Sequence, residues 1–339
     1  MIGRRSKIAS ILAALLATME MTSAAEARCT INAAGLSISP TTGSTGTYTP
    51  PTAPTSQAVT FTVVGTYNTN GTAGTCTVAI AFNRASLPPT MARGGGGATL
   101  PYSIRSAAGG GGNSIVITGA AVPTATQRVQ VSFTSAGPNL INRAFTTNLT
   151  ALFLMAPASP QRAGSYSDGP TLRVYNVNTA GTAALRLTQA FTVTGTVNMA
   201  CTIGGVATPA ADSANIPVSP AGVVTTTPIA KSYLTVVCNS TTRVLATSLG
   251  GAVKTATSAP SGFTNIINYS AAATFSGATS NLNTATIPTA TGSEAGTTGT
   301  TASTTPTGTL SVTITPQSVA SRLVGGSYSD TLRVTLTPF

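Results

Sequence analysis

Apolar and polar residues alternate along many short stretches of this chain. The clearest case lies near its end, where Leu332, Val334 and Leu336 alternate with Arg and Thr residues. A period of two places the three apolar side chains on one face of a β-strand. We therefore expect the last strand to bury that face and to expose the other.

The same alternation, or a short apolar run, predicts strands along the rest of the chain. The predicted strands cover residues 31–38, 58–64, 76–82, 100–104, 114–117, 129–133, 149–155, 191–197, 231–238 and 309–314. The run at 149–155 is nearly all apolar, which is typical of a strand buried on both faces or at the centre of a sheet. Segments rich in Thr, Ser, Gly and Pro, such as 39–55 and 284–306, are predicted as loops. No stretch has helical periodicity, and many short strands with Gly and Pro turns predict β-sandwiches.

A sequence motif occurs twice in the chain. Gly-Ser-Tyr-Ser-Asp, followed closely by Thr-Leu-Arg-Val, occupies 164–174 and again 326–334. The two Asp residues are 162 positions apart (330 − 168), and so are Cys76 and Cys238 (238 − 76). A repeat this long indicates two tandem domains, because solenoid repeats are only about 20–50 residues long. We predict domains at 28–186 and 187–339.

Residues 1–27 have the pattern of a secretory signal peptide. Arg4, Arg5 and Lys7 precede a short apolar core at 8–17, and Ala25–Ala27 fits a cleavage site of small residues. An amphipathic anchor is the alternative reading. The core is too short to span a membrane, since a spanning helix needs about 20 apolar residues.

The chain has four cysteines, two in each copy of the repeat. An exported protein meets an oxidising environment, so disulfides are expected. Four cysteines allow three pairings, and the repeat selects Cys29–Cys76 and Cys201–Cys238. A metal site is the alternative, but the chain has no His and no CxxC spacing.

Few residues suit catalysis. Without His there is no Ser–His–Asp or Cys–His arrangement. The carboxylates after residue 27 are Asp168, Asp212, Glu294 and Asp330, and they do not form a glycosidase pair, since the two in the repeated motif occupy equivalent turns of separate copies. Neither glycine run is followed by the GK[ST] of a phosphate loop. We expect no enzyme activity, no catalytic residue, no cofactor and no metal.

Composition narrows the class of protein further. Charged residues make up 7% of the chain, but 42% of residues are hydrophobic and they fall into alternating runs, which disfavours disorder. The net charge is +11, yet the arginines are scattered singly and aromatic residues are only 5%. We therefore expect no nucleic-acid partner.

Two Tyr–Asp pairs, Tyr166 with Asp168 and Tyr328 with Asp330, come from the repeated motif. They could be mistaken for catalytic pairs, but their repetition in both copies favours a structural role. We expect each Asp to accept backbone amides of a turn and each Tyr to pack at a corner.

The Cys-Thr-Ile start of each copy, the second Cys within a strand, and the closing Gly-Ser-Tyr-Ser-Asp…Leu-Arg-Val-Thr-Leu strand resemble the spore coat protein U domain family. Each of the two copies shows this resemblance, so together they cover essentially the whole chain after residue 27. That family includes subunits of archaic chaperone–usher pili. The resemblance implies two tandem immunoglobulin-like β-sandwiches, the C-terminal one lacking its final strand. In such subunits a periplasmic chaperone, and later an adjacent pilin subunit, supplies that strand by β-strand addition, and an outer-membrane usher assembles the fibre. The acceptor would be the strand with Leu332, Val334 and Leu336.

The order of the two copies suggests a place in the fibre. Cys29 lies next to the predicted cleavage site, so almost no segment precedes it for donation to a neighbour. A subunit that accepts a strand but gives none would lie at the pilus tip, on the cell surface. Residues 191–197 resemble a donor strand and are a candidate for completing the first domain from within the chain.

A tip subunit must contact an abiotic or cell surface, and the family's tip subunits implicate apolar loop ends in attachment and biofilm formation. The candidate loops hold Leu87, Pro88, Pro89 and Met91, and Pro138, Leu140 and Ile141. The alternative is that some of these side chains belong to the core at strand ends. Exposed apolar clusters commonly mark interaction sites, and Arg84, Arg93, Arg105 and Arg143 could attract anionic surfaces.

Two other functions remain open from the sequence. One is a secreted structural coat protein that is not part of a pilus. The other is an outer-membrane β-barrel, since Phe339 follows an alternating stretch. Two expected disulfides, the absence of Trp and the scarcity of aromatic residues speak against the barrel.

Overall fold

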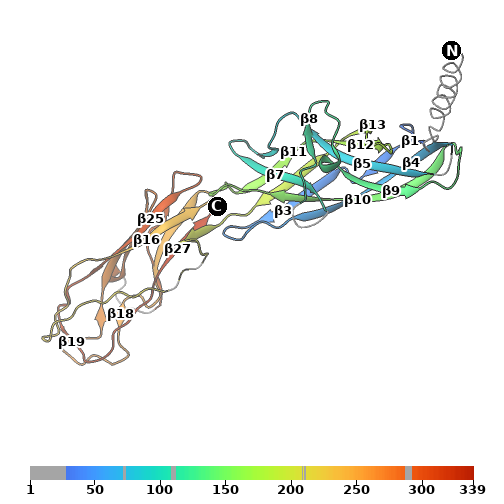
Figure 1. Cartoon of the computed structure of the whole chain (residues 1–339). Coiled ribbons are helices and arrows are strands. Elements are labelled where there is room, and N and C mark those ends of the chain that lie inside the picture. Colours follow the sequence, from blue (N-terminus) through green and yellow to red (C-terminus); the bar gives the residue numbers. More distant parts are fainter. Residues whose placement is uncertain (1–27, 72–73, 108–111, 208, 210, 287–291) are drawn as a thin grey trace, which may run out of the picture.

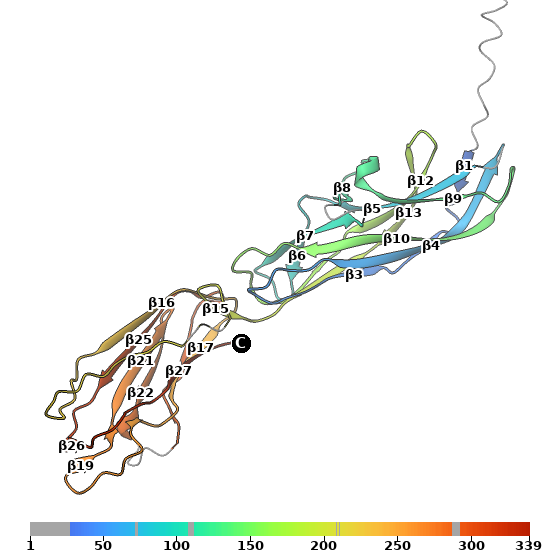
Figure 2. The ribbon, with the colours of Figure 1, turned by 60° about the horizontal axis from the view of Figure 1, so that its bottom comes forward.

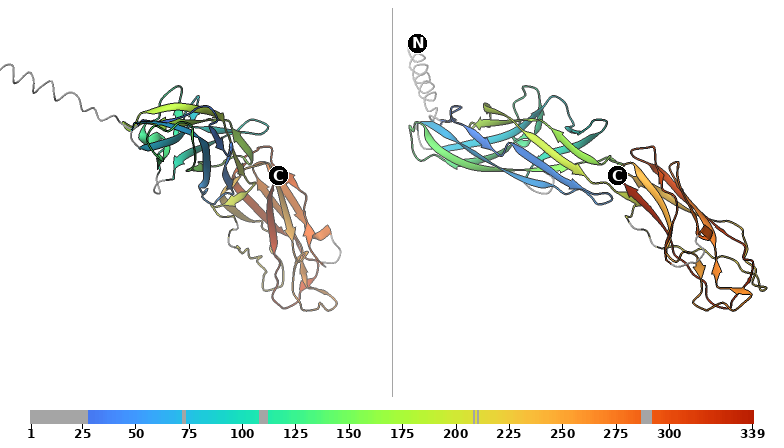
Figure 3. Two further views of the ribbon diagram at one scale, coloured as in Figure 1. Left: turned by 90° about the vertical axis from the view of Figure 1, so that its right-hand side faces the viewer. Right: turned by 180° about the vertical axis from the view of Figure 1, so that it is seen from behind.

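The computed structural model describes residues 28–339 except 72–73, 108–111, 208, 210 and 287–291. The predicted signal peptide, 1–27, lies outside these residues. The described chain is all-β and forms two sandwiches that lie end to end in an elongated molecule (Figure 1, Figure 2 and Figure 3). Its helical elements are two 3-10 turns, η1 (Ala125–Gln127) and η2 (Thr284–Thr286). No helix in the described ranges is long and apolar enough to cross a membrane.

The first sandwich consists of a nine-stranded and a five-stranded sheet. The larger sheet contains, in spatial order, β1 (Arg28–Ile31), β4 (Gln57–Asn70), β10 (Arg143–Met155), β7 (Thr99–Ser106), β6 (Thr90–Arg93), β11 (Gly164–Asp168), β14 (Thr192–Val197) and β3 (Thr42–Tyr48), with β2 (Ser37–Ser39) also on β4. The smaller contains β13 (Ala183–Ala190), β12 (Thr171–Val177), β5 (Thr75–Arg84) and β8 (Val116–Thr118), with β9 (Val129–Thr134) also on β5. All pairs are antiparallel except β3–β14 and β5–β8.

The alternation in these strands builds one core between the two sheets. Phe61 of β4, Phe82 of β5, Phe153 of β10 and Phe191 are all buried, and their ring centroids lie 5.1–6.5 Å apart. Such aromatic pairs contribute about 0.5–1.5 kcal/mol beyond the burial of their area. The apolar run 149–155 lies at the centre of its sheet, with alternate residues buried and the others half-buried.

The second sandwich has a five-stranded and a four-stranded sheet. The five-stranded sheet contains β15 (Cys201–Ile203), β16 (Ile229–Cys238), β25 (Thr307–Pro316), β21 (Tyr269–Phe275) and β22 (Ala278–Asn283). The four-stranded sheet contains β23 (Glu294–Ala295), β17 (Thr242–Ser248) and β24 (Gly299–Thr300), with β27 (Leu332–Pro338) also on β17. Two further pairs of short strands form two-stranded sheets: β18 (Val253–Lys254) pairs with β20 (Ile266–Ile267), and β19 (Phe263–Thr264) pairs with β26 (Arg322–Leu323).

Two predicted elements differ in detail from the elements that the structure shows. The strand expected at 31–38 is interrupted after Ile31, and Gly35 in the intervening turn has a φ of 72°, which glycine adopts readily. The loop expected at 284–306 contains two two-residue strands, β23 and β24, because its backbone pairs with β17.

The predicted disulfides are confirmed. Cys29–Cys76 joins β1 to β5 and so links the two sheets of the first sandwich. Cys201–Cys238 joins β15 to β16, where the two residues are direct cross-strand partners.

The junction between the sandwiches is organised by Asn239, which is 2% exposed. Its side-chain amide donates to the Asn198 carbonyl and its side-chain oxygen accepts from the Ala200 amide, both at 2.8 Å. Its backbone carbonyl accepts from the amide of Ala163 in the first sandwich, also at 2.8 Å. One buried residue therefore binds the connecting segment through its side chain and the first sandwich through its backbone.

Candidate functional site

The last strand, β27, has a neighbour on one edge. It pairs antiparallel with β17, with Val244 opposite Leu336 and Ala246 opposite Val334. No other strand of the described residues pairs with its second edge. An open edge presents unpaired backbone groups to any strand that can reach it.

The hydrogen-bond pattern shows which backbone groups point to the open edge. The Phe339 amide donates to the Thr241 carbonyl, and the Leu249 amide donates to the Thr331 carbonyl, both at 2.9 Å. Residues 331 and 339 therefore bond to β17, and in an antiparallel pair the bonded residues alternate. The amides of Leu332, Val334 and Leu336 consequently point away from β17.

The side chains of these three residues are only half-buried. Leu332, Val334 and Leu336 pack against the core of the second sandwich, whereas Arg333, Thr335 and Thr337 are exposed. The predicted alternation of the strand is thus confirmed, but its apolar face is covered incompletely.

In the first sandwich, the strand that corresponds to β27 is β12, and its outer edge is covered. Both β12 and β27 follow the repeated motif. β12 pairs with β5, which contains the second cysteine of its copy, and β27 pairs with β17, the strand after the second cysteine of its copy. On its other edge β12 pairs with β13. Accordingly Leu172 and Val174 of β12 are both 0% exposed.

The chain then continues from β13 through Phe191 into β14, which crosses to the larger sheet. There β14 pairs antiparallel with β11 and parallel with β3. It places Val193 and Val197 in the core. Gly195 makes this fit possible, since a Cβ there would lie 2.4 Å from Thr45 Oγ1.

The candidate donor stretch 191–197 therefore completes the first sandwich from within the chain. The first sandwich extends to Val197, past the predicted boundary at 186. Both strands after β12 belong to this sandwich, because β13 pairs with β12 and β14 pairs with β11 and β3.

The repeated Tyr–Asp pairs are structural, as predicted. Asp168 Oδ1 accepts the amide of Gly169 at 2.8 Å, and Asp330 Oδ1 accepts the amide of Thr331 at 2.7 Å. The Tyr166 hydroxyl donates to the Arg162 carbonyl, and the Tyr328 hydroxyl donates to the Val324 carbonyl. A Tyr that bonds to backbone four residues upstream is the tyrosine corner of immunoglobulin-like sandwiches.

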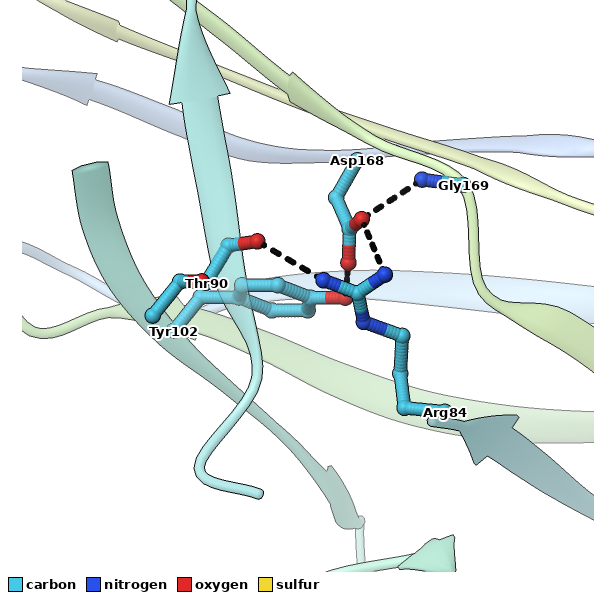
Figure 4. A network of polar contacts seen from close by, with 5 residues as sticks. All are labelled: Arg84, Thr90, Tyr102, Asp168 and Gly169. Carbon is cyan, nitrogen blue, oxygen red and sulfur yellow. Dashed lines mark hydrogen bonds and ion pairs between the residues drawn. The ribbon is translucent and has the colours of Figure 1, made fainter. Parts of the chain in front are cut away.

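A second Tyr reaches each Asp and was not predicted. Tyr102 donates to Asp168 at 2.5 Å (Figure 4), and Tyr269 donates to Asp330 at 2.6 Å. Burial and the bond to Asp168 raise the pKa of Tyr102, and burial and the bond to Asp330 raise the pKa of Tyr269. A Tyr-Ser dipeptide at 102–103 and 269–270 is the sequence signal that could have found them.

The remaining partner of each Asp differs between the copies. Arg84 forms an ion pair with Asp168 at 2.9 Å (Figure 4), whereas Ser248 donates to Asp330 at 2.6 Å. Asp330 also accepts the Gly250 amide at 2.8 Å. Asp330 thereby fixes the start of β27 against the end of β17.

For one of the two predicted surface-contact loops, the prediction is wrong for two of its four residues. Met91 is 0% exposed and Pro89 is also buried, so neither can contact a surface. Met91 lies in β6, a strand of only four residues in which it is the one that faces the core. Leu87 and Pro88 in the same loop are exposed.

The other loop has more exposed apolar surface. Ile141 is 77% exposed and Pro138 is exposed, while Leu140 packs half-buried against the first core. The loop bonds to the end of β4, where the Thr69 amide donates to the Leu140 carbonyl at 2.9 Å. That end of the first sandwich, which carries β1, is the end farthest from the second sandwich (Figure 1).

Two of the four arginines expected to attract anionic surfaces are instead bound to other residues of the first sandwich. Arg84 pairs with Asp168, and Arg93 Nε donates to the Ala163 carbonyl at 2.8 Å. Arg105 and Arg143 are exposed. No group of three or more His, Cys, Asp or Glu side chains that could hold a metal gathers in the part of the chain that the structure describes.

Known proteins resemble this chain only distantly. No family model and no curated protein matches it. Among solved structures, the chaperone–tip adhesion subunit complex CsuC–CsuE of archaic chaperone–usher Csu pili from Acinetobacter baumannii aligns at 12% identity, covering 91% of this chain and 100% of that one, with a TM-score of 0.40. The CupB6 tip adhesin from Pseudomonas aeruginosa aligns at 10% identity over 84% and 86% of the two chains, with a TM-score of 0.33. The CooA pilin from enterotoxigenic Escherichia coli aligns at 14% identity over 48% and 98%, with a TM-score of 0.27. All three TM-scores are below 0.5.

Proposed function

We propose that this protein is an adhesive structural subunit of a chaperone–usher pilus and that its second sandwich accepts a donor strand along β27. The observation that carries the proposal is the contrast between the copies: β12 has β13 on its outer edge, whereas β27 has no second neighbour among the described residues. Strand addition to such an edge gains main-chain hydrogen bonds along the edge and fills side-chain pockets.

The first sandwich supplies a template for the incoming strand. Because β13 runs antiparallel to β12, the donor runs antiparallel to β27. Its backbone bonds to the outward amides of Leu332, Val334 and Leu336, and its alternate apolar side chains cover the half-buried face. A periplasmic chaperone occupies this edge first, the outer-membrane usher receives the complex, and the extension of an adjacent pilin replaces the chaperone.

A tip position follows if the predicted cleavage after Ala27 takes place. Pairing of β1 starts at Arg28, opposite Asn70, so cleavage there leaves no residue ahead of β1 to donate. Residues 183–197 are bound within the first sandwich and are not available to a neighbour. Mass spectrometry of the exported protein decides the cleavage position.

The end of the first sandwich that carries β1 mediates attachment to an abiotic or cell surface, and thereby biofilm formation. Ile141 and Pro138 are exposed there. Exposed apolar side chains gain from leaving water on contact with an apolar surface. No catalytic step is part of this function.

The proposal is tested with a peptide that copies residues 183–197, the strand that completes the first copy. Binding at 100 times its Kd adds about 2.7 kcal/mol, which raises the melting temperature of the second sandwich by about 5–10 °C. A control peptide carries Phe191→Ser and Val193→Ser. A second sandwich that melts at the same high temperature with and without the peptide would indicate a complete fold and a secreted coat protein outside any pilus.

A further inference from the structure

The junction between the two sandwiches lies directly beside the first copy of the repeated motif. The amide of Ala163, the residue before the motif starts at Gly164, donates to the Asn239 carbonyl at 2.8 Å, and Ala163 is only 5% exposed. The strand that completes the first sandwich leads straight into this junction, because Val197 lies opposite Gly164 and β15 begins at Cys201. Completion of the first sandwich and its contact with the second are therefore parts of one arrangement.

The second sandwich has a corresponding end, which is exposed. Gly325 directly precedes the second motif, as Ala163 precedes the first, 162 positions earlier (325 − 163). The backbone around the two residues is alike, since the Tyr166 and Tyr328 hydroxyls each bond to the carbonyl four residues upstream. Gly325 is nevertheless exposed, and its amide donates to no described residue. This end thus presents the same donor that the first sandwich uses in the junction.

Apolar side chains flank the end around Gly325. β26, just before Gly325, pairs with β19, whose Phe263 is 44% exposed. Gly222 also lies beside β26, since a Cβ there would be 3.6 Å from the Leu323 amide nitrogen, and the adjacent Val223 is 61% exposed. β19 and β26 lie at the end of the second sandwich farthest from the first (Figure 2). Exposed apolar side chains gathered in one place commonly mark an interaction surface.

A donor strand that follows the template of the first sandwich brings its own sandwich to this end. If it binds as β14 binds β11, its equivalent of Val197 lies opposite Gly326. In this chain Cys201 follows Val197 by four positions (201 − 197), a span of at most about 14 Å. A pilin whose first cysteine follows its donor strand as closely has its sandwich held beside Gly325.

We propose that the end of the second sandwich with Gly325, Phe263 and Val223 binds the body of the adjacent pilin, as the Ala163 end of the first sandwich binds the second. The Gly325 amide donates to the pilin's backbone carbonyl that directly follows its second cysteine, the place that Asn239 has in this chain. This inference rests on the proposed strand acceptance by β27 and adds a second contact to it. Two contacts fix the angle between the subunits, whereas an inserted strand alone leaves the pilin body free to swing.

The test extends the natural chain after Phe339 in two ways. Val177 holds the equivalent position in the first copy, 162 positions earlier (339 − 177), so each extension starts with residue 178. The shorter extension adds 178–197, the turn and the completing strand. The longer adds 178–339, the same strand followed by a second copy of the second sandwich. Segmental isotope labelling restricts the NMR signals to the natural residues.

Amide hydrogen exchange separates the two contacts. We expect the outward amides of β27 to be protected in both extended chains, and the Gly325 amide to exchange at least tenfold more slowly in the longer chain alone. Asn239→Ala in the appended sandwich should reverse the effect at Gly325 and leave β27 protected, because the side chain no longer binds the connecting segment. The same substitution in the natural sandwich should raise exchange at Ala163, which calibrates the comparison.

The outcomes for Gly325 and β27 are distinguishable. Rapid exchange of Gly325 in the longer chain, with β27 protected, would overturn this inference and leave strand acceptance standing. Equal protection of Gly325 in both extended chains would also overturn it, because the strand alone would then account for the change. Rapid exchange of the outward β27 amides in both chains would overturn strand acceptance and this inference with it.

Discussion

Leu172 and Leu332 occupy the same position of the repeated motif, yet Leu172 is fully buried and Leu332 is only half-buried. The difference arises because β13 covers Leu172, whereas the outer edge of β27 is open in the described chain. Full burial of an apolar side chain is worth about 1.5–3 kcal/mol. The second sandwich therefore has stability to gain from an added strand.

The face of β27 that we assign to the donor can be tested by one substitution. Val334→Asp places a carboxylate on the half-buried face, and a donor strand would bury it without a partner at a cost of about 3 kcal/mol or more. We expect the protein to fail to enter pili, as measured by its amount on the cell surface relative to the periplasm. Thr335→Asp, on the exposed face of the same strand, is the matched control. Equal surface amounts for both variants would reject the assignment.

Alkaline pH should destabilise both sandwiches through Tyr102 and Tyr269. The pKa of each is raised in the folded state, so the neutral form is favoured there, and this stabilisation is complete below the ordinary pKa of about 10. As the pH rises above 10, the unfolded chain loses these protons first and the free energy of unfolding falls.

The matching variants are Tyr102→Phe and Tyr269→Phe. Each loses a hydrogen bond to a carboxylate, at about 1.5–3 kcal/mol near neutral pH, and each should flatten the alkaline decline of its own sandwich. Denaturant unfolding between pH 7 and 11 measures both effects. Tyr48→Phe, whose hydroxyl bonds to no described residue, should change neither; an unchanged alkaline decline in both main variants would refute this role.

The two disulfides should act independently. Each closes a loop, with sequence separations of 47 and 37 residues, and contributes about 4 kcal/mol in the chain-entropy model. Replacing Cys201 and Cys238 by Ala should lower the unfolding midpoint of the second sandwich alone, and replacing Cys29 and Cys76 should lower that of the first alone. Calorimetry resolves the two transitions. Equal effects of either replacement on both transitions would show that the sandwiches unfold as one unit.

Attachment should depend on the far end of the first sandwich. Ile141→Ser removes an exposed apolar side chain at that end, whereas Leu87→Ser removes one on the other predicted loop. We expect fully piliated cells with Ile141→Ser to attach to plastic several-fold less, and cells with Leu87→Ser to attach normally. Undiminished attachment with Ile141→Ser would remove this loop from the adhesive surface.

Much of this architecture could be read from the sequence because it depends on local periodicity and on the repeat. Alternation located most strands, and the equal spacing from Cys76 to Cys238 and from Asp168 to Asp330 selected both disulfides. The donor-like pattern at 191–197 also identified the strand that completes the first sandwich.

What the sequence could not show depends on contacts between distant residues. Tyr102 reaches Asp168 from 66 positions away, and only the folded sheet brings them together. Met91 belongs to a four-residue strand, in which alternation is too short to reveal that it faces the core.

Amide hydrogen exchange of β27 tests strand acceptance most directly. The amides of Leu332, Val334 and Leu336 point to the open edge, while those of Leu172 and Val174 lie in β12 between two paired strands and serve as an internal control. We expect the first three to exchange rapidly in the free protein and to become protected when the 183–197 peptide is added, with the control amides protected throughout. Protection of all three without a donor, or rapid exchange at a saturating concentration of the peptide, would contradict the assignment of β27 as an acceptor strand.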